Sequence, residues 1–262
     1  MGKVISLVNQ KGGVGKTTTS INIAAALAVL GKRVLLVDLD PQGNATTGIG
    51  VNKGDITNSV YDVLIGKCDI KEAIRMTDYK NLYLLPATIN LAGVDLELIN
   101  KSSQDSTFVK GKQLKLSMDT IKDAFNYIII DCPPSLGLLT TNALTASDSV
   151  IIPVQCEFFA LEGITQLLNT IMLAQKSLNP NLNIEGVLLT MLDSRTNLGL
   201  EVVEEIQKYF KERVYNTIIP RLVRLTEAPS HGKPIIAYDP HHKGSEAYLN
   251  LAKEVIERNG NI

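Results

Sequence analysis

Two lysines stand in one glycine-rich segment, residues 9–18, with the sequence Asn-Gln-Lys-Gly-Gly-Val-Gly-Lys-Thr-Thr. The segment follows the apolar run 4–8 and precedes a helical pattern over 17–30, so we expect it to connect a strand to a helix. Backbone N–H groups at such a turn, together with the positive end of the helix dipole, bind phosphate. The expected nucleotide ligands in this segment are Lys11, Gly12, Gly13, Val14, Gly15, Lys16, Thr17 and Thr18.

The two lysines have different expected tasks. Lys16 would reach the β- and γ-phosphates, and the Thr17 hydroxyl would ligate Mg²⁺. The general phosphate-loop pattern asks for glycine six residues before Lys16, where this chain has Gln10, and Lys11 follows it. A second ammonium group near the phosphates would stabilise the charge that develops during phosphoryl transfer. The alternative is that Lys11 is a solvated residue beside the loop.

Two carboxylates follow the second apolar run. Asp38 and Asp40 come at its end, before Pro41 and Gly43. Ligands of open α/β sheets bind at the carboxyl ends of the strands, so these residues are expected near the phosphates. Asp40 would orient or activate the attacking water, and Asp38 would hold the hydration shell of Mg²⁺. An ordinary polar strand end is the alternative interpretation of this pair.

A third apolar run, 127–130, ends in Asp131. An apolar strand that ends in aspartate is the Walker-B arrangement, in which Asp131 would ligate Mg²⁺ through Thr17 or water. The pattern is weak by itself and gains weight beside the loop and the Asp38/Asp40 pair. The expected catalytic residues are therefore Lys11, Lys16 and Asp40, and the expected metal site consists of Thr17, Asp38 and Asp131.

Short apolar runs alternate with helical periodicity over almost the whole chain. Strands are expected at 4–8, 33–38, 82–85, 127–131, 149–154, 184–190 and 217–219. Helices are expected at 17–30, 60–65, 114–124, 138–146, 163–178, 198–209 and 244–257, and the polar stretch 101–112 is expected to be a surface loop. The runs are rich in Val, Ile and Leu without polar alternation. This predicts an α/β fold with a doubly wound, mostly parallel sheet covered by helices on both faces, in one domain over 1–262.

Composition restricts the class of protein. Hydrophobic residues make up 45% of the 262-residue chain, which is typical of a globular protein. Lys and Arg number 26 against 27 Asp and Glu, so any nucleic-acid binding would need a local basic patch. No apolar run is long enough to span a membrane, and the first strand follows Met1 too closely for a signal peptide. Three widely spaced cysteines fit reduced thiols in a cytoplasm.

These motifs together resemble the deviant Walker family, which includes Soj/ParA partition ATPases, MinD and the nitrogenase iron protein. The shared pattern is Lys-Gly-Gly-x-Gly-Lys-Thr at 11–17. The chain is most similar to Soj/ParA proteins, through Val-Asp-Leu-Asp-Pro-Gln-Gly-Asn-Ala-Thr (37–46), Asp-Cys-Pro-Pro-Ser-Leu-Gly-Leu-Leu-Thr (131–140), Pro-Val-Gln-Cys-Glu (153–157) and Glu-Ala-Pro-Ser-His-Gly-Lys-Pro-Ile (227–235). Gln10 matches that subfamily, whereas MinD and the iron protein carry glycine there.

The resemblance implies a DNA-segregation ATPase that uses ATP and Mg²⁺. ATP would drive formation of a homodimer in which Lys11 contacts the partner's nucleotide, and hydrolysis would return monomers. A ParB/Spo0J-like centromere-binding protein would stimulate hydrolysis, and the resemblance also implies a role in the control of replication initiation. The protein would be cytoplasmic and nucleoid-associated. Since the phosphate loop begins by residue 9, no N-terminal helix-turn-helix extension and no operator-specific repression are expected.

Non-specific DNA is the partner that the resemblance implies. The matching basic positions are Arg195 and Arg224, and Arg221 and Lys243 are added from their basicity. Segment 195–243 holds eight Lys/Arg against six Asp/Glu, so composition alone would fit a mixed, solvated surface. MinD-like membrane attachment would need a basic amphipathic tail, but the leucines and charges of 247–262 are typical of a helix packed on the protein.

The resemblance also places adenine against loops after the last strands, which would involve Met191, Pro220 and Arg221. Two further activities of the wider family find no support in the sequence. A shared iron–sulfur cluster would need two suitably placed cysteines, and Cys132 is more plausibly buried behind Asp131. A bacterial tyrosine kinase would carry a C-terminal tyrosine cluster, and the tail has only Tyr248. The sequence leaves open whether the protein serves a chromosome or a plasmid.

Overall fold

The computed structural model describes residues 2–157 and 162–260, and its strands form one sheet in the order β3-β4-β2-β5-β1-β6-β7. The edge strand β3 pairs antiparallel with β4, and all other neighbours in the sheet are parallel. This confirms the predicted mostly parallel α/β sheet. The strands are β1 (Lys3–Leu7), β2 (Val34–Asp38), β3 (Arg75–Met76), β4 (Leu82–Leu85), β5 (Tyr127–Asp131), β6 (Ser149–Gln155) and β7 (Asn183–Thr190).

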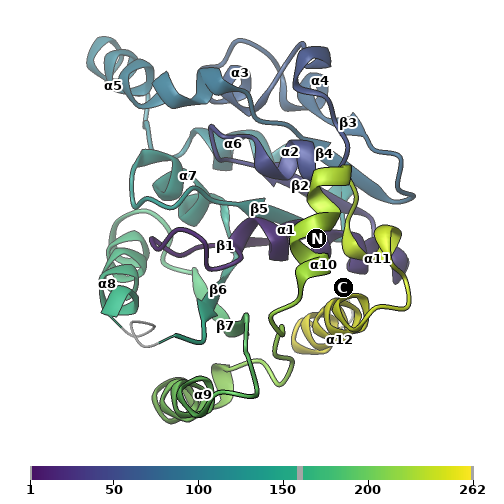
Figure 1. Cartoon of the computed structure of the whole chain (residues 1–262). Helices are drawn as coiled ribbons and strands as arrows, with labels where there is room; N and C mark the ends of the chain where they lie inside the picture. The colour runs from purple at the N-terminus through teal and green to yellow at the C-terminus, as the bar shows by residue number, and fades with distance from the viewer. Residues whose placement is uncertain (1, 158–161, 261–262) are drawn as a thin grey trace.

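Helices connect the strands along the chain. The α-helices are α1 (Lys16–Val29), α2 (Asn44–Gly48), α3 (Val60–Leu64), α4 (Ile70–Ala73), α5 (Val94–Gln104), α6 (Gln113–Asp119), α7 (Leu138–Ala146), α8 (Glu162–Ser177), α9 (Asn197–Phe210), α10 (Val223–Glu227), α11 (Ile235–Tyr238) and α12 (Lys243–Arg258). Short 3₁₀ turns are η1 (Lys53–Asp55), η2 (Ile89–Gly93), η3 (Lys122–Ala124), η4 (Lys211–Arg213) and η5 (Ala228–His231). Figure 1 shows α5 near the β3–β4 edge of the sheet and α9 near the β7 edge.

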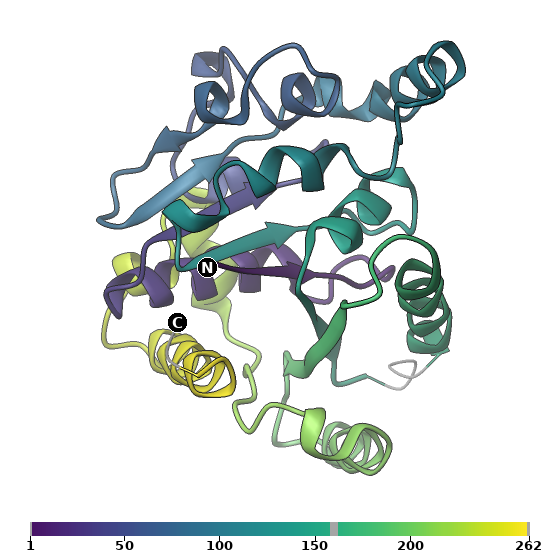
Figure 2. The same cartoon turned by 180° about the vertical axis from the view of Figure 1, so that it is seen from behind.

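The sheet has an apolar layer on each face, because its central strands alternate buried side chains between the two sides. One core joins the strands to apolar residues of α3, α5, α6, α7, α8 and α9, and the other joins them to α1 and α12. Seen from behind, α6 and α7 lie in front of the central strands (Figure 2). Strands β2 and β5 are buried at every position, which is why neither run shows polar alternation.

The register of the central strands assembles the site. β5 lies between β1 and β2, and Asp131 at its end is opposite Leu7 on one side and Asp38 on the other. The segments that follow these three parallel strands therefore all begin at the carboxyl ends of the strands, next to one another. The phosphate loop follows β1, and the Asp40 segment follows β2.

The expected strand at 217–219 is wrong. In the structure this segment meets the edge strand β7 through the backbone bond from Ile219 N to Leu189 O, and an isolated bridge between Leu192 and Pro220 follows just beyond both segments. The N–H groups of Asn216 and Thr217 instead donate to the Glu254 carboxylate of α12, at 2.8 and 3.1 Å. Donors that are satisfied by a side chain are not available for a strand ladder.

The expected loop at 101–112 is wrong in its first residues, because 101–104 form the last turn of α5. Val94 and Leu98 are the buried residues of this helix, four positions apart, and they anchor it despite its polar C-terminal half. The expected helix over 114–124 breaks into α6 and the turn η3. The two-residue strand β3 has no apolar run and was not expected.

The predicted C-terminal helix is confirmed as α12. Its buried residues include Tyr248, Leu251 and Val255, and they pack in the same core as α1. The Tyr248 hydroxyl lies 3.3 Å from the Thr19 hydroxyl of α1. Among the helices of the described part of the chain, none combines the length and apolarity needed to cross a membrane.

Candidate nucleotide-binding site

The glycine-rich loop lies between β1 and α1, as predicted. Gly13 and Gly15 adopt left-handed backbone angles, with φ of 77° and 86°. Only glycine takes these angles without strain, so the loop can turn sharply and direct its N–H groups toward an anion. Helix α1 begins at Lys16 directly after Gly15, which adds the positive end of the helix dipole to the same place.

Side chains outside the motif fasten the loop to the sheet. The Asn9 amide donates to the Pro153 carbonyl at 2.8 Å, while its oxygen accepts from the Lys11 N–H at 3.0 Å. On the other side, the Thr190 hydroxyl of β7 donates to the Val14 carbonyl at 2.9 Å. These bonds hold the loop between β6 and β7, and sequence reasoning assigned a role to neither Asn9 nor Thr190.

Lys16 is buried at the floor of the loop, with 7% of its surface exposed. Its ammonium group donates to the Lys11 carbonyl at 2.9 Å. Burial lowers the pKa of Lys16, and the nearby carboxylates of Asp131 and Asp40 oppose that shift. A cation held under the loop in this way is suited to contact phosphate oxygens.

Asp131 is fully buried at the end of β5. Its Oδ1 accepts from the Ser20 hydroxyl at 2.9 Å, and its Oδ2 has no hydrogen-bond partner among the described residues. Burial, followed by the charge of Asp38, raises the pKa of Asp131 to about 7, against the lowering effect of bonds from Thr17 and Ser20. An unpartnered carboxylate oxygen beside the Thr17 hydroxyl fits a divalent cation.

Magnesium in such a site would depend on the nucleotide. Within the described ranges, no group of three His, Cys, Asp or Glu side chains could hold a metal by itself. Mg²⁺ commonly binds through one or two protein oxygens, water and substrate phosphates. Thr17 and Asp131 would supply the protein oxygens here.

Asp38 accepts hydrogen bonds that the sequence did not predict. Its Oδ2 accepts from the Thr46 N–H and the Thr46 hydroxyl, both at 2.7 Å, and its Oδ1 accepts from the Asp40 N–H at 3.2 Å. The Thr46 hydroxyl accepts in turn from the Ala87 N–H at 3.1 Å. Burial raises the pKa of Asp38 to about 6. The described contacts of Asp38 therefore position the Asp40 segment, and its contact with the hydration shell of Mg²⁺ stays a prediction.

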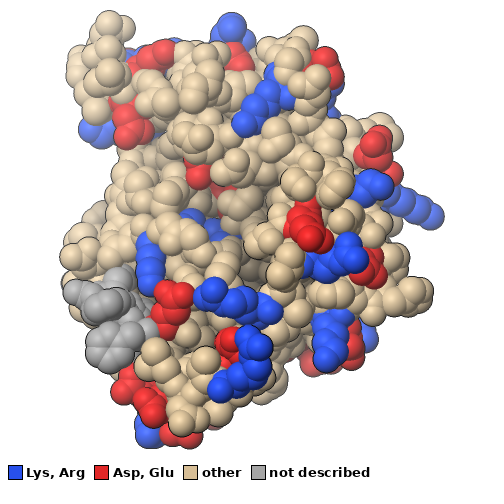
Figure 3. Space-filling view, viewed as in Figure 1, with Lys and Arg blue, Asp and Glu red and all other residues tan. Residues whose placement is uncertain are grey.

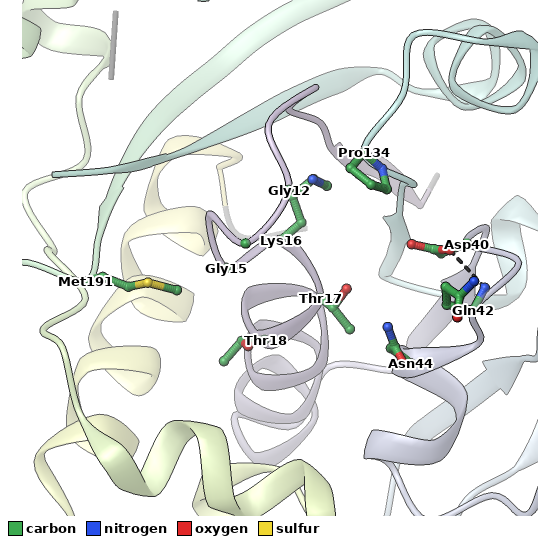
Figure 4. Close-up of a pocket in the computed structure, with 11 residues that line it drawn as sticks. Gly12, Gly15, Lys16, Thr17, Thr18, Asp40, Gln42, Asn44, Pro134 and Met191 are labelled. Atoms are coloured by element: carbon green, nitrogen blue, oxygen red, sulfur yellow. Dashed lines mark hydrogen bonds between the residues drawn. The ribbon is translucent and has the colours of Figure 1, made fainter. Parts of the chain in front are cut away.

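Asp40 lines a cavity of about 340 Å³ together with the phosphate loop. Its carboxylate accepts from the Gln42 N–H at 2.9 Å, and the side chains of Gln42 and Asn44 lie beside it (Figure 4). The cavity is lined by Gly12, Gly13, Gly15, Lys16, Thr17, Thr18, Asp40, Gln42, Asn44, Pro134 and Met191. A carboxylate at this wall can accept a hydrogen bond from a water molecule next to bound phosphate.

A second cavity of about 140 Å³ shares Gly15, Thr18 and Met191 with the first. Pro220 and Arg221 line it as well, so the structure brings the three predicted adenine contacts together beside the loop. The apolar side chains of Ile219, Leu222 and Leu225 complete much of its wall. Met191 has a left-handed φ of 54°, which a non-glycine residue adopts at some cost. Its side chain lines both cavities and lies at the left of the close-up in Figure 4.

Lys11 is placed at the rim, unlike Lys16. Its side chain is 39% exposed, and its ammonium group lies 3.8 Å from the Glu157 Oε2. The other oxygen of Glu157 accepts from Arg221 Nη2 at 3.1 Å. One carboxylate outside the loop therefore faces both a loop lysine and an arginine of the second cavity.

The basic residues predicted to bind DNA are at the surface. Side chains of Arg195, Arg221 and Arg224 are 87%, 56% and 51% exposed, and each of these arginines pairs with a carboxylate of the same chain. Lys243 begins α12. Lys/Arg and Asp/Glu side chains are interspersed in the lower half of the face in Figure 3, below its central hollow.

The cysteines are structural, as expected. Cys132 and Cys156 are buried in one core, and Cys68 packs against it. All three thiols are free. Burial raises the pKa of Cys132 and Cys156, which keeps both thiols protonated.

A mostly parallel sheet, a glycine-rich loop after β1 with a buried lysine, and a Walker-B aspartate at the end of β5 together define a P-loop nucleotide-binding protein. Residues 2–184 match a family model described as an AAA domain. The chain is 62% identical to the sporulation initiation inhibitor protein Soj of Bacillus subtilis, over 97% of this chain and 98% of that protein. It is 50% identical to the chromosome partitioning protein ParA of Myxococcus xanthus, over 98% and 89%.

The chain therefore belongs to the Soj/ParA family of chromosome-partitioning ATPases, as its motifs indicated. Among solved structures, cobyrinic acid a,c-diamide synthase of Mycobacterium smegmatis with bound ADP and magnesium is similar, with a TM-score of 0.85 and 38% identity. The match covers 99% of this chain and 96% of that one. A relative that holds a nucleotide and magnesium confirms the predicted cofactor class, ATP with Mg²⁺.

Replacing Lys16 tests the loop assignment. Lys16→Ala should lower ATP affinity at least roughly a hundredfold, because charge-assisted hydrogen bonds to phosphate are lost. Calorimetric titration with ATP and Mg²⁺ measures the effect, and Lys71→Ala on the exposed surface of α4 is the matched control. ATP affinity retained by Lys16→Ala would remove the assignment.

The raised pKa of Asp131 predicts a pH-dependent stability. Between its ordinary pKa of 3.8 and the raised value of about 7, the folded state holds a proton that the unfolded state releases, so stability falls as the pH rises through this window. Asp131→Asn should therefore raise the Tm of the nucleotide-free protein at pH 8 and have little effect at pH 4.

Thermal melts at both pH values, without and with ATP and Mg²⁺, measure this difference. The Asn variant should also lose the part of the ATP-induced stabilisation that depends on Mg²⁺. A Tm below that of the unchanged protein at pH 8, without ligand, would contradict the burial argument.

Proposed function

We propose that the whole chain acts as one ATPase domain whose ATP-bound homodimer binds DNA non-specifically. The observation that carries this proposal is the division between the two loop lysines. Lys16 is buried under the loop, whereas Lys11 is 39% exposed at the rim of the same site. One cation is suited to the nucleotide of its own subunit, and the other can reach a nucleotide that approaches from outside.

Catalysis in this proposal uses a small set of side chains. Lys16 neutralises the terminal phosphates, and Asp40 holds the attacking water next to them. When bound, Mg²⁺ supplies charge neutralisation at the phosphates, and Thr17 and Asp131 would hold it. Asp38 keeps Asp40 in place through the bond to its N–H. The cavity that Asp40 shares with the loop supports these roles.

The dimer would place two such sites face to face. Two ATP molecules that approach each other repel, and a Lys11 from each subunit beside the partner's phosphates would offset that repulsion. Before dimerisation the Lys11 ammonium lies near Glu157, at 3.8 Å. An exposed pair at this distance is weak, so phosphates can replace the carboxylate at small cost.

The second cavity supports the position of the base. Adenine would stack among Met191, Pro220 and the neighbouring apolar side chains, next to the loop that holds the phosphates. Arg221 lines the same cavity, which supports a contact with the nucleotide. Its side chain is also 56% exposed beside Glu157, which supports a contact with DNA. Base contacts through Met191, Pro220 and Arg221 are part of the proposal.

DNA would bind through Arg195 and Arg224, with additions from Arg221 and Lys243. Two-fold symmetry doubles the phosphate contacts, so dimerisation itself would raise DNA affinity and its salt dependence. A ParB/Spo0J-like centromere-binding partner would stimulate hydrolysis and release the dimer from the nucleoid. Control of replication initiation would be a further output of the same switch.

Asp40→Ala separates ATP binding from hydrolysis. Removing the carboxylate that holds the water should reduce kcat by roughly a hundredfold or more, a typical share for general-base catalysis, while ATP affinity changes little. Phosphate release measures turnover, and light scattering measures the molecular mass. The variant should accumulate as an ATP-bound dimer that binds DNA. Unchanged hydrolysis would refute the water-positioning role.

The pair Arg195→Ala and Arg224→Ala tests the DNA surface. The double variant should lose non-specific DNA binding and still dimerise on ATP, because both arginines lie outside the nucleotide cavities. Lys71→Ala with Lys80→Ala removes the same charge elsewhere and should bind DNA normally. Titration with duplex DNA in ATP, in ADP and without nucleotide, beside a liposome control, measures both effects.

Two results would count against the DNA assignment. One is normal DNA binding by the double arginine variant. The other is ATP-dependent binding to liposomes in place of DNA, which would favour the membrane alternative.

A further inference from the structure

The most exposed of the predicted DNA-binding arginines is held by a carboxylate of its own loop. Arg195 Nε donates to Asp193 Oδ1 at 2.8 Å, and Arg195 Nη2 donates to Asp193 Oδ2 at 2.7 Å. This two-pronged geometry is the one in which a guanidinium also binds phosphate. The bonds from Arg195 lower the pKa of Asp193, so this carboxylate stays charged. Asp193 thus occupies the donors of Arg195 that a DNA phosphate would need.

Asp193 also builds the turn that presents Arg195. Its Oδ1 accepts from the Arg195 N–H at 3.1 Å, which is an Asx-type turn. The Asp193 carbonyl accepts from the Thr196 N–H and hydroxyl, at 3.2 and 2.9 Å, and Thr196 then caps α9. The negative charge of Asp193 and its role in the turn are separable, since an amide oxygen can accept the same backbone bond.

The other two arginines follow the same pattern. Arg224 lies 3.5 Å from Glu227 and 3.9 Å from Asp239, and Arg221 lies 3.1 Å from Glu157. The lower half of the face in Figure 3 accordingly shows basic and acidic side chains next to one another. Each of these arginines is therefore already paired with a carboxylate when a phosphate approaches.

We propose that Asp193 is an affinity-determining residue of the DNA-binding surface, where it competes with phosphate for Arg195. The inference rests on the proposed DNA-binding function. When a phosphate takes the guanidinium, the Asp193 carboxylate remains close to it and repels it. Arg195 is also partly neutralised before binding, so its contact with DNA releases fewer counterions. One subunit then binds DNA weakly, and useful affinity requires both Arg195 side chains of a dimer.

Asp193→Asn is the test, because it removes the charge and keeps an oxygen for the turn. An exposed ion pair is worth roughly threefold in affinity per subunit, so the dimer should bind about tenfold more tightly. The slope of log affinity against log salt should steepen by up to about 2, from about 0.9 per unmasked phosphate contact. Fluorescence anisotropy with duplex DNA, over a salt series in the non-hydrolysable analogue AMPPNP and in ADP, measures both quantities.

Two further variants complete the design. Asp193→Ala removes the charge and the turn together, so it should gain less affinity than Asp193→Asn. Asp123→Asn removes one exposed carboxylate from η3, which precedes β5 and so lies at the amino end of the parallel strands, whereas Arg195 follows the carboxyl end of β7. This control variant should leave the salt slope unchanged.

The outcomes separate this inference from the function on which it rests. If the unchanged protein binds DNA in AMPPNP and Asp193→Asn binds no more tightly, with the same slope, the role of Asp193 is refuted and DNA binding stands. If neither protein binds DNA in any nucleotide state, the proposed function fails and this inference fails with it. Tighter binding by Asp193→Asn and Asp123→Asn alike would reduce the effect to bulk charge and also refute it.

Discussion

Two carboxylates side by side in the interior are the constraint on which this site depends. The register of β2 and β5 places Asp38 opposite Asp131, and both are fully buried. Adjacent buried charges of like sign are unfavourable unless hydrogen bonds and cations compensate them. Asp38 is compensated by Thr46 and the Asp40 N–H, and Asp131 by Ser20 and the nearby ammonium of Lys16. Asp131 Oδ2 has no hydrogen-bond partner among the described residues, so this centre can accept a divalent cation that arrives with phosphate.

Hydrogen bonds link the buried Asp38/Asp131 pair to the residues around it. Asp38 fixes the segment that carries Asp40, so the buried pair and the wall of the nucleotide cavity share one set of hydrogen bonds. Asn9 and Thr190 tie the phosphate loop to β6 and β7, and Thr190 at the end of β7 also lines the second cavity, just before the segment that leads to Arg195. The phosphate loop, the second cavity and the Arg195 segment are therefore connected through the ends of these strands.

Sequence patterns were reliable where apolar burial alone decides structure. The strand runs that became β1, β2, β4, β5, β6 and β7 are buried on both faces, and the helices that cover them have clear apolar spacing. Prediction failed where a side chain from elsewhere competes for the backbone, as Glu254 does at Asn216 and Thr217. It also failed at 101–104, where the buried residues Val94 and Leu98, earlier in the same helix, anchor a polar C-terminal turn.

The sequence by itself determined the class of site, because glycine positions, two lysines and strand-end aspartates are local requirements of phosphate binding. It also identified Met191, Pro220 and Arg221, through resemblance, as residues that the fold then brought together. Only the tertiary structure decided how each charge is used. Strand register placed Asp38 opposite Asp131, and tertiary packing buried Lys16, left Lys11 at the rim and paired Arg221 with Glu157. These contacts join segments distant in the chain, so local spacing carries no record of them, whereas the pairs Arg195–Asp193 and Arg224–Glu227 join near neighbours in the sequence.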